Sequence, residues 1–363
     1  MSAISLVLPT LNGENELPGL LAALGAQSRP ADEIVVVDSS SDDNTCEVAA
    51  RGNGESKIES GPANNKQPLV GVIVPTYKRA DRLGAALHSI FNQTYKNIEV
   101  VVVNDNIPGS FWDEATEGIL SSMNDSRLRV VHTTGEVGGG AARNYACRHT
   151  HGEYLAFLDD DDEFEKDKIE TQLDFMVSNK LDMSWQDVSW YNESGKLVEH
   201  RRLDHCRDFS QEGLLRAHLR TPIAPTSIYM IRKDLFDRTD GFGEVRTGQD
   251  WWLMLRCIEA GAKVGYMPEV HVRQYIHGGQ RLSLGLNKIK GEEQRHAKVR
   301  EYYPILSKKE INYIEFRHNA VLAFACARGG RISDAVRYAF KTIRSSPITC
   351  IKEGFSYAIR AKK

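Results

Sequence analysis

Residues 154–164 read YLAFLDDDDEF, and this stretch decides the fold because it joins a buried strand to a cluster of acids. The residues from Tyr154 to Leu158 predict a strand that is buried on both faces. Four carboxylates follow at the carboxyl end of this strand, which is where open α/β sheets bind their ligands. The stretch therefore predicts a strand-end site in an α/β sheet.

The four consecutive carboxylates predict a metal site. Along an extended chain alternate side chains share a face, so we expect Asp159 and Asp161 to point one way and Asp160 and Asp162 the other. Carboxylates this close repel one another, and a hard divalent cation such as Mg²⁺ or Mn²⁺ keeps them ionised. The alternative is an acidic turn that caps the helix expected near Glu165. The buried strand ahead of the cluster favours the metal.

Composition and charge exclude several classes of protein. The chain has 363 residues, 41% hydrophobic and 26% charged, as in a globular protein with one large domain or two modest ones. The net charge of −3 argues against a nucleic-acid binder. The six cysteines show no C-x-x-C spacing, which predicts neither a zinc site nor a disulfide framework. With neither a signal peptide nor a spanning segment recognisable, we expect a cytoplasmic protein whose membrane contact is at most peripheral, on the inner face of the plasma membrane.

The opening of the chain occurs twice, in residues 5–38 and 71–105. Both copies run apolar strand, Pro-Thr, amphipathic helix, turn, apolar strand and acid, which is a βαβ half-unit. Residues 52–68 are rich in Gly, Asn, Ser and Pro and predict a linker. Residues 1–51 are therefore predicted to be a partial repeat without chemistry of its own, since half a sheet cannot enclose a ligand.

The second copy continues into a glycine-rich loop. Residues 128–132 predict a third strand, and TTGEVGGGAARN, residues 133–144, leads into a helix. Glycines such as Gly139 before a helix N-terminus let the backbone approach a phosphate, and Arg143 can add a charge-assisted fork to a diphosphate. The alternative is a flexible turn.

Three segments together resemble the family 2 glycosyltransferases, which are inverting, nucleotide-sugar-dependent enzymes with the GT-A fold. The segments are VPTYKRADRLGAALHSIFNQTYKNIEVVVVND, GGGAARNYA and GEYLAFLDDDDEF, at residues 74–105, 138–146 and 152–164. The resemblance covers about residues 69–277. It implies a Rossmann-like mixed sheet flanked by helices, with the catalytic domain over residues 69–285 and a helical extension behind it.

The resemblance also implies roles for individual residues. In this interpretation Asp105 holds the edge of the nucleobase, and Asp159 and Asp161 bind the metal. Asp159 is also implied to contact the nucleotide sugar. The further residues implied to contact it are Pro75, Thr76, Tyr77, Gly139, Arg143 and Asp160. The chain departs from the family pattern at Arg79, where many relatives have an acid. It departs again at residues 104–108, NDNIP, where most relatives have Asp-Asp-x-Ser.

The general base is expected in GFGEVRTGQDWWLMLR, residues 241–256. The resemblance implies Asp250, because an acceptor hydroxyl is a poor nucleophile until its proton is removed. Gln249 stands where the family has a glutamate, and the alternative for Asp250 is an acid that satisfies the helix dipole. The following Trp251 and Trp252 could equally belong to the core. His277 is the candidate that completes the metal site, although a lone histidine is often structural.

The C-terminal region, residues 286–363, is basic and helical in pattern. From Leu306 onward twelve Lys and Arg face four Asp and Glu, a net charge of +8. Helical periodicity covers residues 310–328 and 333–345. This helical pair could lie on an anionic membrane surface. Alternatively, its cations could simply form the solvated face of a helix that packs on the protein.

By the resemblance, the chain transfers a sugar from a UDP-sugar to a hydroxyl of a glycan or lipid-linked acceptor, with inversion, in synthesis of the bacterial cell envelope. A nucleotidyltransferase is a weaker alternative, because neither copy has a glycine-rich loop with a phosphate-binding lysine near its first strand. A catalytically inactive scaffold that binds a nucleotide or a partner enzyme is the other alternative.

Overall fold

The structure is a computed structural model. It describes residues 5–10, 15–27, 33–38, 56–58, 67–223, 225–243, 245, 247–276, 286–347 and 349–350. The chain divides into two compact units, Met1–Gln67 and Pro68–Lys363.

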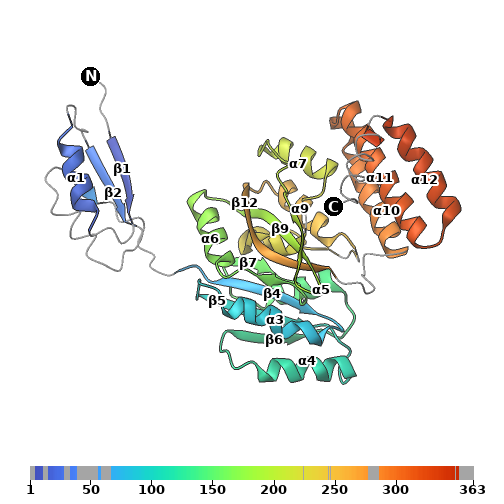
Figure 1. Ribbon diagram of the computed structural model, residues 1–363, viewed down its shortest axis with the longest axis horizontal. Coiled ribbons are helices and arrows are strands. Elements are labelled where there is room, and N and C mark those ends of the chain that lie inside the picture. Colours follow the sequence, from blue (N-terminus) through green and yellow to red (C-terminus); the bar gives the residue numbers. More distant parts are fainter. Residues whose placement is uncertain are drawn as a thin grey trace. The chain divides into compact units, whose positions relative to one another are not determined.

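A mixed nine-stranded sheet forms the centre of the larger unit (Figure 1). Its strands are β4 (Val70–Thr76), β5 (Ile98–Asn104), β6 (Leu128–His132), β7 (Tyr154–Phe157), β8 (Glu163–Phe164), β9 (Met183–Asn192), β10 (Leu197–Arg201), β11 (Met230–Arg232) and β12 (Val264–Ile276). The order is β6-β5-β4-β7-β11-β9-β12-β8, with β10 paired to β9. Strands β6, β5, β4 and β7 are parallel, whereas β11 is antiparallel to both of its neighbours. The predicted mixed sheet is confirmed.

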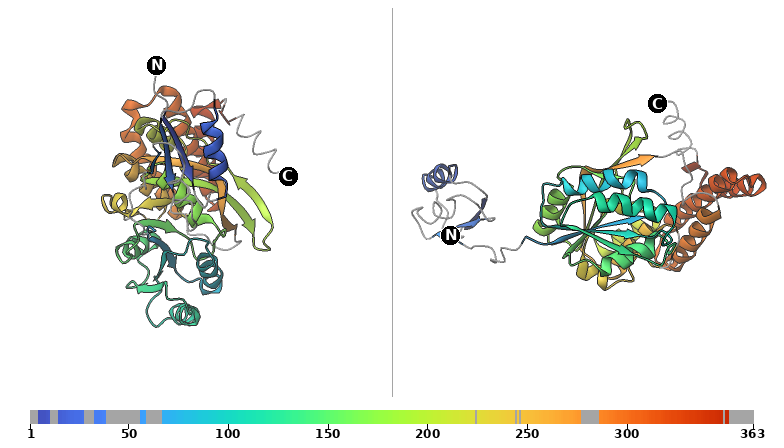
Figure 2. Two further views of the ribbon diagram at one scale, coloured as in Figure 1. Left: turned by 90° about the vertical axis from the view of Figure 1, so that its left-hand side faces the viewer. Right: turned by 90° about the horizontal axis from the view of Figure 1, so that it is seen from below.

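Helices lie on both faces of this sheet (Figure 2). They are α3 (Ala80–Phe91), α4 (Phe111–Ser122), α5 (Gly139–Arg148), α6 (Lys168–Ser178), α7 (Gln211–Arg220), α8 (Lys233–Asp237) and α9 (Gln249–Glu259). The C-terminal extension consists of α10 (Leu286–Glu301), α11 (Lys308–Arg328) and α12 (Ile332–Ser345), with α12 on its outer side (Figure 1). No helix among the described residues is long and apolar enough to cross a membrane.

The elements form where the apolar pattern requires them. The valine-rich strands β4 and β5 are buried almost along their whole length, and α3 turns Leu83, Leu87 and Ile90 toward them. In the extension, Ser307 and Glu310 form a capping box that starts α11. The predicted helical pair is confirmed, with its break at Gly329 and Gly330.

The N-terminal unit repeats the topology of the sheet's parallel edge. Its three strands, β1 (Ser5–Thr10), β2 (Glu33–Asp38) and β3 (Ser56–Ile58), are parallel in the order β1-β2-β3, and α1 spans Leu17–Gly25. The register also repeats, since Thr10 pairs with Asp38 as Thr76 pairs with Asn104. Strand β3 lies within residues 52–68, which were predicted to be a linker. Three residues give too little pattern for the composition to reveal a strand.

Candidate active site

Parallel pairing brings the candidate residues to one edge of the sheet. Strand β4 is parallel to β5, with which it pairs up to Thr76, and to β7, with which it pairs up to Ile73, so the carboxyl ends of the three strands lie at the same edge. The amide of Leu158 continues the pairing beyond β7 and donates to the carbonyl of Ile73 at 3.0 Å. The four aspartates that follow Leu158 therefore start beside the end of β4.

The aspartates form a turn rather than an extended chain. The amide of Asp162 donates to the carbonyl of Asp159 at 3.1 Å, and the turn rotates the side chains away from strict alternation. Carboxylate oxygens of Asp159, Asp161 and Asp162 lie within 4.8 Å of one another. The expected pairing of Asp162 with Asp160 on an opposite face is therefore wrong. Asp160 instead points toward Arg79, whose Nη1 lies 3.2 Å from its Oδ1.

The cluster holds more negative charge than its surroundings neutralise. Burial raises the pKa of Asp160 to about 7, although the Arg79 guanidinium works against this shift. Burial also raises the pKa of Asp162 well above its usual range, and Asp159 and Asp161 add to the effect. The amides of Tyr275 and of the Gln274 side chain donate to Asp162 at 3.0 and 3.1 Å. Three converging carboxylates, one of them buried with a raised pKa, fit a hard divalent cation.

Arg79 supplies a cation beside the acid cluster. It is the N-cap residue of α3, and its guanidinium contacts both Asp160 and Asp161. The pKa shift of Asp160 would be larger without it, because its charge is the main influence that favours the ionised carboxylate. Arg79 is therefore part of this site, a role that the sequence did not reveal.

Arg143 joins the glycine-rich helix to the acid cluster. It lies one turn into α5, contacts Asp159, and donates from Nη1 to Oε1 of Gln249 at 3.1 Å. A Cβ on Gly140 would lie 3.1 Å from the side-chain carbon Cδ of Gln249. The absence of side chains at this helix start thus makes room for Gln249 from α9, a packing function that the loop pattern alone does not show.

Asp105 holds the loop that precedes α5. Its side chain is 2% exposed and accepts from the hydroxyl of Thr133 at 2.5 Å and from the amides of Val137 and Gly138 at 3.0 Å each. Two backbone amides of the glycine-rich loop are therefore already engaged. The predicted contact of Asp105 with a nucleobase stays a prediction, as does that of Gly139 with a diphosphate.

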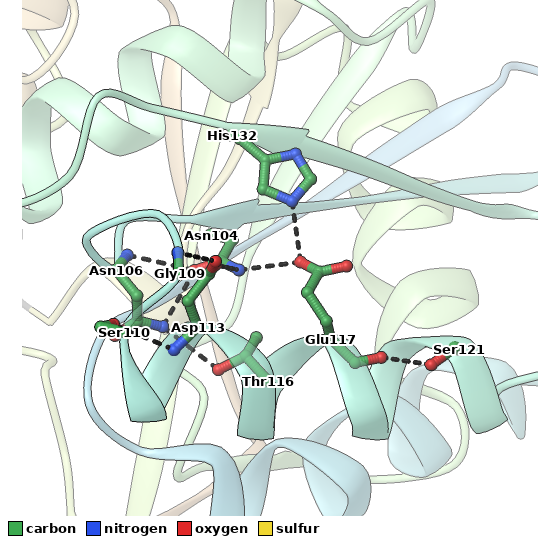
Figure 3. A network of polar contacts seen from close by, with 9 residues as sticks. All are labelled: Asn104, Asn106, Gly109, Ser110, Asp113, Thr116, Glu117, Ser121 and His132. Atoms are coloured by element: carbon green, nitrogen blue, oxygen red, sulfur yellow. Dashed lines mark hydrogen bonds and ion pairs between the residues drawn. The ribbon is translucent and has the colours of Figure 1, made fainter.

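A polar network fixes the corner that carries Asp105 (Figure 3). The amide group of Asn104 donates to Asp113 at 2.8 Å and to Glu117 at 2.9 Å, both on α4, and Glu117 also contacts His132 at 2.7 Å. The carboxylates and the histidine lie close enough to hold a cation. However, the Asn104 amide already donates to both carboxylates, so hydrogen bonds satisfy this cluster.

Tyr77 and Lys78 lie at the rim of the same edge. The Tyr77 hydroxyl donates to Glu136 at 2.5 Å, and Lys78 pairs with the same carboxylate at 3.0 Å. Thr76, the last residue of β4, is buried, and Pro75 precedes it. Their predicted place in a nucleobase pocket stays a prediction.

Asp250 lies in the first turn of α9, and this helix begins directly after Gly248, which has a left-handed conformation (φ 72°). Burial raises the pKa of Asp250, and the nearby charge of Asp159 adds to the shift, while Lys288 and Arg143 oppose it. Of the acid cluster, Asp159 is thus the residue whose charge acts on Asp250. Of the two tryptophans that follow, Trp251 is 1% exposed and stacks on His218 at 5.3 Å, so it belongs to the core.

His277 lies outside the described residues. The last described residues of β12 reach the cluster, since the amide of Tyr275 donates to Asp162. The metal-binding role of His277 stays a prediction.

Comparison with known proteins identifies the family. The model of glycosyl transferase family 2 matches residues 5–58 and 71–239, more than half of the chain and both copies of the repeat. An uncharacterized glycosyltransferase of Rickettsia felis is 33% identical over 223 residues, 60% of this chain and 35% of that protein.

Two relatives have more specific names. The putative teichuronic acid biosynthesis glycosyltransferase TuaG of Bacillus subtilis is 35% identical over 133 residues, 36% of this chain and 51% of TuaG. The UDP-Glc:alpha-D-GlcNAc-diphosphoundecaprenol beta-1,3-glucosyltransferase WfaP of Escherichia coli is 34% identical over 119 residues, 33% of this chain and 45% of WfaP. The chain spans only about a third to a half of the length of these three relatives.

Two solved structures share the fold. TarS 1–349 of S. aureus in complex with UDP-GlcNAc gives a TM-score of 0.55 at 18% identity, over 76% of this chain and 79% of that chain. The mannosyltransferase PcManGT from Pyrobaculum calidifontis, in complex with GDP-Man and Mn²⁺, gives 0.53 at 22% identity, over 82% and 87%. The fold is thus of the GT-A type predicted, and with the family match it leads to one conclusion: the chain belongs to glycosyl transferase family 2.

Proposed function

We propose that this glycosyltransferase transfers a sugar from a UDP-sugar to a hydroxyl of a lipid-linked glycan during synthesis of the bacterial cell envelope, with inversion at the anomeric carbon. The observation that carries the proposal is the convergence of Asp159, Asp161 and Asp162 at the strand ends, where the charge of Asp159 also acts on Asp250. The name of WfaP supports the lipid-linked acceptor, and the name of TuaG supports a role in synthesis of a cell-envelope polysaccharide. WfaP and the TarS complex support a UDP-sugar as donor.

The three converging carboxylates fit Mn²⁺ or Mg²⁺. They are oxygen donors within 4.8 Å of one another, and the raised pKa of Asp162 reflects a site that a cation would relieve. A bound cation would act as a Lewis acid that stabilises the leaving diphosphate. Asp159 and Asp161 would hold it as the resemblance implies, and Asp162 would add a third carboxylate. The Mn²⁺ of the PcManGT complex supports this assignment.

Arg143 is suited to orient the donor. Its guanidinium is fixed between Asp159, Gln249 and the ring of Phe242, which lies 5.6 Å away. A guanidinium held in this way presents a fixed positive charge to the diphosphate of the nucleotide sugar. Pro75, Thr76 and Tyr77 line the nucleobase end of the site.

Asp250 would act as the general base. A carboxylate with a raised pKa removes a proton more effectively than an ordinary one, provided that the pH keeps it ionised. As the proton of the acceptor hydroxyl passes to Asp250, the oxygen bonds to the anomeric carbon from the face opposite the diphosphate. The bond between the sugar and the diphosphate breaks, and the configuration inverts.

A transfer assay with Asp250→Asn tests this function. Wild-type enzyme should release UDP from the correct donor only when acceptor is present and yield an inverted product, as read by NMR. The variant should bind UDP normally but turn over about 10²- to 10⁴-fold more slowly. Wild-type turnover in the variant, or a product with retained configuration, would contradict the mechanism. Absence of transfer with every donor would favour the inactive scaffold.

A lipid-linked acceptor would also determine where the enzyme acts. We propose that it acts at the inner face of the plasma membrane, as a peripheral membrane protein.

A further inference from the structure

Helix α12 has an apolar face that is largely exposed in the described part of the fold. Four large side chains on it are 51–67% exposed, and they recur at spacings of four, four and three residues. They are Ile332, Val336, Phe340 and Ile343. This spacing places them in one stripe along the helix, here called the α12 stripe. Single exposed apolar residues are ordinary, but a continuous stripe marks a contact surface.

The stripe is separate from the face that holds α12 to the protein. Ala335 and Thr342 are buried, and Ala335 packs with Leu322 and Cys326 of α11. The residue spacing places the stripe on another side of α12. Helix α12 itself lies on the outer side of the extension (Figure 1). It is therefore available to a large external surface.

A row of cations runs beside the stripe. Arg337, Lys341 and Arg344 each follow directly after a stripe residue, which places them about 100° further around the helix. All three are exposed. The only acid of α12, Asp334, is paired with Arg331 and Arg337. Residues 328–345 contain five Lys or Arg and one Asp, a net charge of +4.

We propose that the α12 stripe binds an anionic lipid surface, with α12 lying in the plane of the membrane. An apolar stripe would enter the boundary between headgroups and acyl chains, and the adjacent cations would lie at the anionic headgroups. A second copy of the chain fits less well, because a twofold contact through this stripe would bring the cation rows of the two copies together. The choice of a membrane rests on the proposed lipid-linked acceptor.

Vesicle sedimentation of the full chain tests the proposal. Vesicles of equal parts phosphatidylcholine and phosphatidylglycerol should bind the protein in a salt-sensitive manner, and vesicles of phosphatidylcholine alone should bind it weakly. Phe340→Asp should lower the partition coefficient at least about tenfold, because it removes an apolar ring and adds an anion. Phe340 is 67% exposed, so the variant should fold.

A matched control uses the same substitution elsewhere. Phe111 on α4 is 73% exposed, and Phe111→Asp should leave vesicle binding unchanged. The double variant Lys341→Glu, Arg344→Glu should lose the preference for anionic vesicles while its circular dichroism stays that of the wild type. Equal binding of wild type and Phe340→Asp to anionic vesicles would overturn the proposal.

The same measurements separate this proposal from the proposed function. Asp250→Asn should bind vesicles like the wild type although it transfers sugar far more slowly. Transfer to a water-soluble acceptor without vesicle binding would refute only the α12 surface. A concentration-dependent dimer that Phe340→Asp dissociates, with no vesicle binding, would assign the stripe to a second copy.

Discussion

Replacing Asp105 with asparagine distinguishes a residue that holds the loop from one that only binds nucleotide. The side chain is buried, and its two oxygens accept three hydrogen bonds from Thr133, Val137 and Gly138. In Asp105→Asn one oxygen becomes an NH₂ group, which must face a donor. The loss of one charge-assisted hydrogen bond and the burial of an unpaired N–H should lower the free energy of unfolding by about 2–4 kcal/mol.

Urea denaturation followed by circular dichroism measures this loss. Asp81→Asn, at an exposed position in the first turn of α3, is the control and should change the free energy of unfolding by less than about 1 kcal/mol. Because the loop leads into α5, which carries Arg143, UDP affinity should fall as well. If Asp105→Asn keeps wild-type stability but loses UDP affinity, then the loop does not depend on Asp105 and our interpretation is wrong.

Two other substitutions test a buried charge in the sheet domain and the packing around the candidate site. Lys168 is fully buried, no described residue accepts a hydrogen bond from its Nζ, and burial lowers its pKa to about 7. The unfolded chain therefore binds more protons than the folded one between about pH 7 and 10.5, so stability should rise with pH across this window. Lys168→Met should remove this rise and stabilise the protein by roughly 2–4 kcal/mol at pH 7, and equal pH dependence in both proteins would contradict the assignment. Gly140→Ala should displace Gln249 and slow sugar transfer about tenfold or more. The control Gly118→Ala, at a glycine with open space around it, should leave the rate of transfer unchanged. Equal rates in the two variants would refute the packing function of Gly140.

The sequence predicted most strongly what local patterns encode. Two valine-rich strands, the repeated half-unit and the helical pair at 308–345 all carry periodicities that survive into the structure. The order of motifs also predicted the family. The burial of Lys168, by contrast, could not be predicted, because nothing in the neighbouring sequence shows that the fold covers this side chain.

The details of the site depend on contacts between distant residues. Whether four aspartates form a turn or a strand depends on the packing around them, so Asp162 was assigned to the wrong face. Arg79 and Gln249 were seen only as departures from a family pattern, since their partners lie 81 and 106 residues away. Asn104, another departure from the pattern, donates hydrogen bonds to Asp113 and Glu117 of α4.

Calorimetry of UDP binding with and without Mn²⁺, in the wild type and in Asp161→Ala, tests the central claim most directly. Asp161 lies in the carboxylate cluster, so we expect UDP to bind tightly only with Mn²⁺ and the variant to lose that metal-dependent binding. The glycine substitution Gly118→Ala serves as the control that should bind like the wild type. Binding of UDP that is equally tight without metal, or that Asp161→Ala leaves unchanged, would contradict a metal-assisted nucleotide-sugar site at these strand ends.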